Sequence, residues 1–255
     1  MKLFKVLATA SIVSIQAVYS QQADSTQNTI NFSGSVGITN NGFSIIPTFS
    51  LNSPAVIILP SWRKKRLSFD PDIRLVLDGR KGGMVFWLRY RLIEQKKFSL
   101  RLGVHPAFSF IRKTIDDNGK PLEITEMLRF AAGEVVPAYE ITPNWRVEAT
   151  YFHGSALQKY GPRYADVLFF NTSISNIRLS KHLRFQLTPM VYFLDTDGYQ
   201  GNYILITGVL SHKNLPFSIQ SSINQTFSSD IPGNKDFMWM VLLNYHFNKN
   251  FKRVK

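Results

Sequence analysis

FMWMVLLNYHF, the stretch from Phe237 to Phe247, decides the fold of this chain. Its odd-numbered residues form a wholly apolar and mostly aromatic face, whereas Asn244 and His246 lie on the opposite face. A period of two residues is typical of a β-strand. A strand of about ten residues whose apolar face is aromatic at its ends matches the strands of transmembrane barrels. This segment therefore indicates an outer-membrane β-barrel.

The same alternation recurs along the chain in twelve segments. They span approximately residues 28–38, 43–59, 66–78, 84–92, 98–108, 122–139, 144–152, 164–177, 183–193, 202–211, 215–227 and 237–247. We therefore predict an all-β fold, a closed antiparallel transmembrane β-barrel of about 12 strands with short periplasmic turns and longer outer loops. Two features are irregular. Pro47 and Pro54 predict a bent or bulged second strand, and the link Asn40-Asn41-Gly42 is short where a long outer loop is expected.

Residues 1–20 have the pattern of a secretory signal peptide. Lys2 and Lys5 give a positive start, and residues 6–18 form a short apolar run before a cleavage position. A transmembrane anchor is the alternative, but this run is too short and is interrupted by polar residues. We expect residues 21–255 to form one barrel domain.

Composition agrees with a barrel better than with a helical membrane protein. No stretch approaches 18 continuous apolar residues, and the mean hydropathy is only −0.08 although 44% of the residues are hydrophobic. Alternating lipid-facing and lumen-facing residues produce this average. The absence of Cys excludes disulfides and thiolate metal sites.

A soluble, secreted barrel or sandwich would also alternate, with its apolar face inside. Two observations favour the membrane instead. The apolar faces are long and aromatic at their ends, and the polar faces are rich in Ser, Thr, Asn, Gln and Arg rather than Lys and Glu. The composition of the polar faces suits an enclosed, water-filled lumen.

The formal net charge is +13, and part of the excess falls on polar faces of consecutive strands. Arg74, Arg89, Arg91 and Arg101 would form one basic wall in the lumen. Such a wall predicts an anion-attracting pore or a site for an acidic ligand. The alternative is a plug of ion pairs, because a barrel of twelve strands lies between filled and open barrels. The carboxylates available for those pairs are Asp70, Asp72, Glu134 and Glu148.

Other basic residues lie in the turns and in the tail Lys249–Lys255. We expect them to meet anionic outer-membrane lipid or another envelope protein. The barrel-assembly machinery is an expected partner during biogenesis, and nucleic acid is not. We predict no cofactor and no metal, because the runs Asp116–Gly119 and Asp195–Gly198 are typical of turns rather than of Ca²⁺ sites.

One constellation indicates chemistry. His153 and Ser155 flank Gly154 at the outer end of the seventh segment and share the lipid-facing side. A His beside a Ser can act as base and nucleophile when an acid or amide orients the His. Asp166, on the next segment, is the candidate for that third role. The alternative is a polar strand end at the membrane interface.

The His-x-Ser pair resembles that of twelve-stranded outer-membrane phospholipases and of lipid A deacylases. In those families the pair acts on the outer wall of the barrel, towards the outer leaflet. The resemblance covers three residues, and Ala156 stands where those families have Asn after the serine.

As a whole the chain resembles uncharacterised outer-membrane β-barrel proteins of the Bacteroidota type. The resemblance rests on GFSIIPTFSL (Gly42–Leu51), LRLGVHPAFSF (Leu100–Phe110), FFNTSISNIRLS (Phe169–Ser180) and KDFMWMVLLNYHF (Lys235–Phe247). It implies a small closed barrel and brings no known activity. The tail after Phe247 departs from barrels that end on their last aromatic residue.

Two hypotheses of function follow from the sequence. The first is a narrow pore or an accessory, structural subunit of an envelope complex, with no enzymatic activity. The second is an outer-membrane lipid hydrolase that uses Ser155, His153 and Asp166. Both place the protein in the cell outer membrane.

Overall fold

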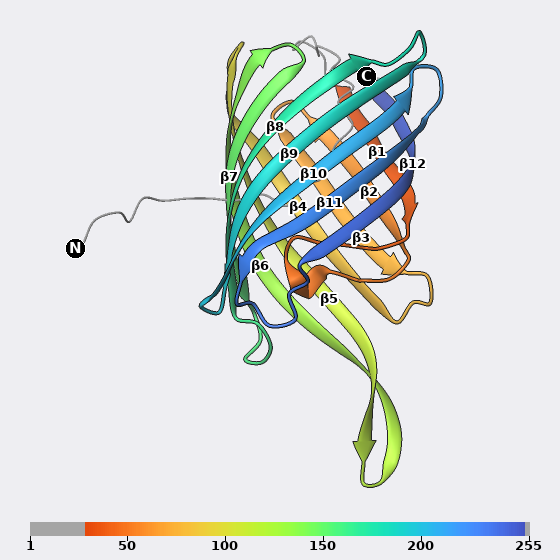
Figure 1. The fold of residues 1–255 in the computed structure, drawn as a ribbon, viewed down its shortest axis with the longest axis vertical. Helices are drawn as coiled ribbons and strands as arrows, with labels where there is room; N and C mark the ends of the chain where they lie inside the picture. Colours follow the sequence, from red (N-terminus) through yellow and green to blue (C-terminus); the bar gives the residue numbers. More distant parts are fainter. Residues whose placement is uncertain (1–28, 253–255) are drawn as a thin grey trace, which may run out of the picture.

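Twelve antiparallel strands close into a barrel in the computed structural model, which describes residues 29–252 (Figure 1). Each strand pairs with its neighbour in sequence, and β1 closes the barrel against β12. The strands are β1 (Thr29–Thr39), β2 (Ala55–Lys64), β3 (Leu67–Val76), β4 (Lys81–Glu94), β5 (Phe98–Asp117), β6 (Lys120–Thr142), β7 (Trp145–Ala156), β8 (Tyr164–Arg178), β9 (Leu183–Thr196), β10 (Tyr199–His212), β11 (Phe217–Ser229) and β12 (Phe237–Lys252). The predicted fold class is confirmed. The predicted signal peptide, residues 1–20, lies outside the described residues.

The faces of the strands have the predicted orientation. On β12, Trp239 and Tyr245 are about half exposed on the outer wall, whereas Met240 and Asn244 are buried inside. The other strands repeat this pattern, and most of the exposed large apolar side chains lie on the outer wall. Apolar side chains on the outside and polar ones inside are what a barrel in hydrocarbon requires. Within residues 29–252 no helix is long and apolar enough to cross a membrane.

The half of the lumen towards the outer loops is apolar rather than polar. Trp87, Phe152, Phe169 and Tyr192 are almost fully buried there and form one cluster with side chains from the other strands. Because this cluster fills the inside of the wall, the loop end of the barrel has a packed core, as in small barrels whose interior is just wide enough for side chains.

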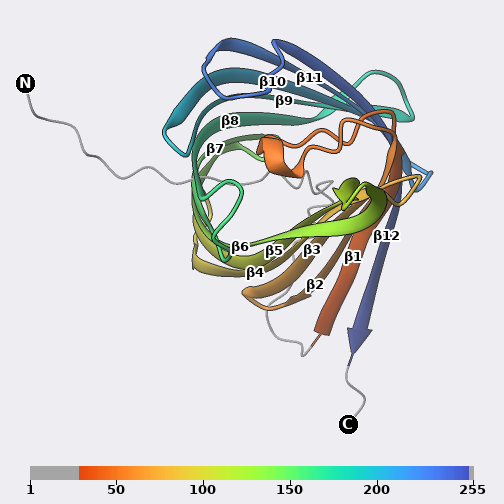
Figure 2. The ribbon, with the colours of Figure 1, turned by 90° about the horizontal axis from the view of Figure 1, so that it is seen from below.

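The predicted second strand, residues 43–59, is wrong in its first part. Residues 40–54 form a connection that folds into the lumen and contains a short 3₁₀ helix, η1 (Pro47–Phe49), which Figure 2 shows inside the ring of strands. Phe43, Ile45 and Ile46 pack into the apolar cluster. Their alternation with polar residues resembles a strand, but Pro47 lacks an N–H and fits the first turn of a helix instead. The long connection also removes the predicted exception of a short link at residues 40–42.

Strands extend further than predicted at the end with the outer loops. β5 and β6 continue as a hairpin that projects beyond the barrel (Figure 1) and turns at Asn118-Gly119, and β9 and β10 turn at Asp197-Gly198. All four of these residues have positive φ, as two-residue hairpin turns require. The expected long loops at residues 112–121 and 195–201 are therefore mostly strand. The opposite end, where the described chain begins and ends, carries short turns such as Lys65-Arg66 and Pro143-Asn144, so we assign it to the periplasm.

Candidate functional site

Two groups of residues are candidates for function, and they lie on opposite faces of the wall. The first group is the set of lumen arginines. Arg89 is 3% exposed, and its Nε lies 2.8 Å from Glu134 Oε1 while its Nη1 lies 3.2 Å from Asp70 Oδ2. Arg101 Nε approaches the same Glu134 oxygen at 3.3 Å. The buried guanidinium of Arg89 and the half-buried guanidinium of Arg101 therefore each face a carboxylate.

The remaining two arginines are also paired. Arg74 makes two parallel bonds to Asp72, of 2.8 and 2.7 Å, and a third to the Phe43 carbonyl oxygen at 3.0 Å. Arg91 pairs with Glu94 nearer the periplasmic rim. The structure thus pairs Arg74, Arg89 and Arg101 with acids of the same strand or of strands close by in the wall.

The connection formed by residues 40–54 is held in the half of the lumen towards the outer loops by polar contacts as well as by apolar packing. Lys81 Nζ donates to the Ser50 carbonyl at 2.6 Å, and Ser109 Oγ donates to the Thr48 carbonyl at 3.0 Å. The Arg74 bond to Phe43 anchors its start. This connection therefore acts as a plug, which we call the lumen plug (residues 40–54).

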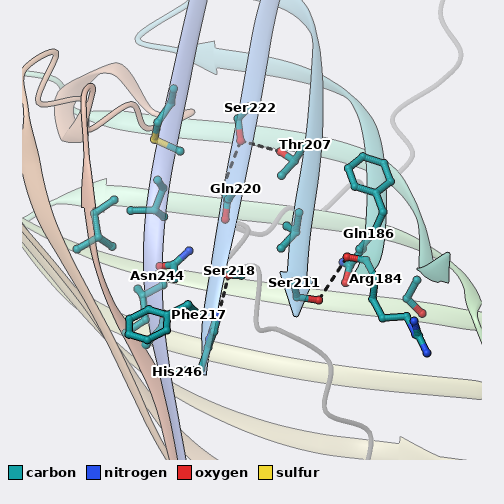
Figure 3. A pocket seen from close by; sticks show the side chains of 18 of the residues that line it. Arg184, Gln186, Thr207, Ser211, Phe217, Ser218, Gln220, Ser222, Asn244 and His246 are labelled. Atoms are coloured by element: carbon teal, nitrogen blue, oxygen red, sulfur yellow. Dashed lines mark hydrogen bonds between the residues drawn. The ribbon is translucent and has the colours of Figure 1, made fainter. Parts of the chain in front are cut away.

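On the periplasmic side of the lumen plug, the lumen contains a cavity of about 690 Å³. Hydroxyl and amide side chains line its middle, among them Thr207, Gln220 and Ser222, which hydrogen bond to one another, and Asn244 (Figure 3). Its charged lining residues are all basic: Arg74, Arg178, Arg184 and Lys213. Apolar side chains such as Phe185, Leu205 and Leu242 complete the lining.

The second group lies on the outer wall. His153 on β7 stands directly opposite Asp166 on β8 in the antiparallel register, and Ser155 follows on the same face of β7. His153 Nδ1 lies 2.8 Å from Asp166 Oδ1, and His153 Nε2 lies 3.0 Å from Ser155 Oγ. The structure therefore brings together all three residues of the second hypothesis, in the order acid, His, Ser.

Local structure explains how two strands hold this geometry. The period of two places His153 and Ser155 on one face, and directly opposed residues of an antiparallel pair are close enough for their side chains to bond. Gly154 lies between them on the lumen side, where an added Cβ would come within 3.0 Å of the Phe152 ring. The ring of Phe152 therefore covers the inner side of the site, and glycine leaves room for it.

The sequence did not reveal Tyr151 as part of the site. Its hydroxyl donates a 2.7 Å hydrogen bond to Asp166 Oδ1, the same oxygen that His153 contacts. Tyr151 shares the outer face of β7 with His153 and Ser155, so their parity was visible in the sequence. The bond to Asp166 depends on the register between β7 and β8, which was not visible.

The surroundings of the site are partly apolar and partly polar. Beside Asp166 the outer wall carries a hollow of about 280 Å³, lined by Tyr151, Leu168 and Phe193 and, nearer the loops, by Asn202. The His153 side chain is 49% exposed and the Asp166 side chain 34% exposed on this wall. The group therefore lies where apolar wall gives way to polar loops, the height of the interface in a membrane barrel.

The backbone N–H groups that follow Ser155 already donate hydrogen bonds to backbone carbonyls. The Ala156 N–H donates to the Arg163 carbonyl at 2.7 Å, and the Leu157 N–H donates to the Arg129 carbonyl at 2.8 Å. Any extra donors for negative charge at this site must therefore come from side chains or from rearrangement of the loop 157–163.

No known protein family matches this chain, and no curated protein matches it either. Among solved structures it is similar to the KdgM porin, with a TM-score of 0.51 and 12% identity over 84% of this chain and 99% of that one. It is also similar to the CymD monoaromatic hydrocarbon channel, with a TM-score of 0.44 and 9% identity over 89% of this chain and 90% of that one. A third similar structure is an outer membrane channel from Pseudomonas putida F1, with a TM-score of 0.44 and 11% identity over 88% of this chain and 95% of that one.

At these identities the similarity to the KdgM porin concerns the fold alone. The chain has the fold of outer-membrane β-barrel proteins, and this fold indicates an outer-membrane location. The more specific resemblance to barrels of the Bacteroidota type stays a prediction.

Proposed function

We propose that this protein is an outer-membrane hydrolase that cleaves acyl esters of membrane lipids with Ser155, His153 and Asp166. The observation that supports this proposal is the continuous set of hydrogen bonds Tyr151–Asp166–His153–Ser155 on the lipid-facing wall. A nucleophile, a base within reach of it and an acid that orients the base form the arrangement used in acyl transfer.

The chemistry follows from the two contacts of the imidazole. Asp166 accepts a hydrogen bond from the Nδ1–H of His153, which holds the tautomer whose Nε2 is unprotonated and can accept the Ser155 proton. The Ser155 oxygen then attacks the ester carbonyl, and His153 returns the proton to the departing alcohol. Water, deprotonated by His153, releases the fatty acid from Ser155 and restores the serine hydroxyl.

The position of the site on the barrel supports a lipid as the substrate. The three side chains face outward, where an integral barrel meets lipid rather than solvent or lumen. The adjacent hollow offers Leu168 and Phe193 to an acyl chain and polar groups to the part nearer the surface. Because the site lies at the end with the outer loops, the substrate would lie in the outer leaflet.

The test is acyl release by the purified protein in lipid vesicles. We expect fatty acid release by the unmodified protein and loss of release in Ser155→Ala. Ser221→Ala is the matched control, because Ser221 is another exposed serine, on β11, with no His beside it. Equal release by Ser155→Ala and Ser221→Ala, with both variants folded, would refute the proposal.

A pore remains the second candidate, and the cavity of about 690 Å³ favours it. The lumen plug and the apolar cluster stand between this cavity and the outer loops. We expect low conductance in planar bilayers and a clear increase when residues 41–53 are replaced by a short Gly-Ser linker. If the replacement leaves the conductance unchanged, the lumen is closed by the wall side chains themselves and the pore hypothesis fails. The role of an accessory subunit, with an envelope partner, stays a prediction, as does recognition by the assembly machinery.

A further inference from the structure

The basic side chains around Ser155 have no ionic partner among residues 29–252. Arg129, Lys159 and Arg163 are exposed, and none of them takes part in an ion pair within the described part of the chain. In the lumen, by contrast, Arg74, Arg89 and Arg101 are each paired with a carboxylate. Three unpaired cations next to the proposed nucleophile therefore need a separate explanation.

Register places Arg129 beside the nucleophile. Ala131 on β6 is the cross-strand partner of Ser155, and Arg129 lies two residues further along β6 on the same outward face. Diagonal neighbours of this kind are about 7–8 Å apart, within reach of a long side chain. Arg129 can therefore reach a group that is bound next to Ser155.

The loop that carries the other two basic residues is held against β6. Gln158 Oε1 accepts the Arg129 N–H at 2.7 Å, and the Tyr160 hydroxyl donates to the Met127 carbonyl at 3.2 Å. At its end, the Arg163 N–H donates to the Asp197 carboxylate at 2.8 Å. These bonds hold the loop 157–163, with Lys159 and Arg163, at the same end of β6 and β7 as Arg129.

The carboxylates nearby, Asp166, Asp195 and Asp197, form no ion pair with these cations in the described part of the chain and accept hydrogen bonds from other groups. Asp197 accepts from the N–H groups of Arg163 and Tyr164, and Asp195 accepts from the Gly198 N–H and the Gln200 amide. Asp166 is held by Tyr151 and His153. The end of the site nearest the outer loops is thus left with unpaired guanidinium and ammonium groups.

We infer that the substrate carries a phosphate close to its scissile acyl ester and that Arg129, with Lys159 and Arg163, binds this phosphate; the inference rests on the proposed hydrolase function. Arginine presents several N–H donors in a planar fork that matches phosphate oxygens. The acyl chain lies along Leu168 and Phe193 while the phosphate lies on the side of the loop 157–163. Phospholipids and phosphorylated glycolipids both supply this chemistry.

The experiment compares substrates and variants in mixed micelles of the full-length protein. The substrates are a neutral diacylglycerol, phosphatidylglycerol and a diphosphorylated lipid A, so the last two distinguish the sources of phosphate. We expect kcat/KM about 10- to 100-fold higher for a phosphorylated lipid than for diacylglycerol, the effect of one charge-assisted bond. Arg129→Ala should remove this preference through KM, and Arg129→Lys should keep part of it. Added salt should weaken the preference, because these charges are exposed.

Arg112→Ala is the matched control. Arg112 is an exposed residue on the outward face of β5, also without an ion pair in the described part, and it lies beyond the site. Its variant should keep the full preference. Equal kcat/KM on neutral and phosphorylated lipids, or an Arg129→Ala variant that loses kcat equally on both, would overturn the inference while leaving the hydrolase intact. Absence of hydrolysis of every substrate would refute the proposed function itself.

Discussion

Polar side chains in the lumen and on the outer wall of this barrel differ in their exposure and in their partners. Inside, Arg89 and Glu134 are nearly inaccessible, and their charges are joined to each other and to Asp70. Outside, His153 and Asp166 are half or one-third exposed on the outer wall, at the height of the membrane interface. Charged groups in a lumen satisfy one another and stabilise the wall. The polar groups on the outer wall instead form one hydrogen-bonded set around a serine, and this arrangement supports the proposed catalytic role.

The largest effect that this contrast predicts is on the outer wall. His153→Ala should reduce acyl release roughly 10⁴- to 10⁶-fold, because the base and the nucleophile of such sites act as a unit. Initial rates of fatty acid release would measure it. The circular dichroism spectrum and the unfolding midpoint should stay unchanged, since no buried group is left without a partner. A variant that kept more than a tenth of the activity would exclude His153 as the base.

Replacement of the acid should have a smaller effect on the same rate. Asp166→Asn keeps the shape of the side chain but favours the wrong imidazole tautomer, and we expect a loss of about 10⁴-fold in kcat. Steady-state kinetics on one lipid substrate would measure it, with KM nearly unchanged. An Asn variant as active as the unmodified protein would show that the 2.8 Å contact between His153 and Asp166 has no role in turnover.

A change inside the barrel should alter stability and leave the reaction untouched. Glu134→Ala leaves the Arg89 guanidinium buried with one fewer carboxylate, and breaking a buried ion pair costs about 3–5 kcal/mol. Urea unfolding in lipid vesicles would measure the loss. Glu126→Ala, which breaks the exposed pair with Lys113, is the control and should cost about 1 kcal/mol or less. Similar losses in both variants would contradict the contrast between buried and exposed pairs.

The lipid-facing orientation of the wall can be tested on the strand that indicated the fold. Leu243, in the middle of β12, is 45% exposed on the outer wall. Leu243→Arg should destabilise the barrel by about 2–4 kcal/mol, the cost of a cation on the lipid face near the bilayer centre. Leu243→Ala is the control for lost apolar area. If the Arg variant were as stable as the Ala variant in urea unfolding, this face would not be in contact with hydrocarbon.

The smallest predicted effect concerns Tyr151. Tyr151→Phe removes one hydrogen bond to Asp166 and keeps the ring, so we expect a loss of about tenfold in kcat with little change in KM. Steady-state kinetics on one lipid substrate would measure the loss, and an unchanged kcat would show that Tyr151 only packs against the wall.

Sequence periodicity predicted the barrel because each strand has to present one face to lipid and the other to the lumen. It failed at residues 43–54, where Phe43, Ile45 and Phe49 alternate like a strand. Those side chains pack into an apolar cluster that is itself inside the barrel. Alternation reports that side chains are buried on one side, and it does not report whether lipid or packed lumen covers them.

For the candidate site, the shared face of His153 and Ser155 was predictable because it depends only on a period of two. The position of Asp166 opposite His153 depends on the register of β7 and β8, which the length of the loop 157–163 sets. The Arg89–Glu134 bond joins residues 45 positions apart, on β4 and β6, over Gly103 of the intervening β5. Neither pairing follows from local pattern, because each depends on how distant strands are aligned.

The most direct measurement of the central claim is covalent labelling of the folded barrel with a lipid-like fluorophosphonate, followed by peptide mass spectrometry. Such a reagent reacts with a serine whose hydroxyl is activated by a neighbouring base. We predict a single adduct on Ser155 that disappears in His153→Ala, with Ser221 unmodified. A folded, membrane-embedded barrel in which Ser155 stays unlabelled, or in which Ser221 reacts equally, would contradict the account.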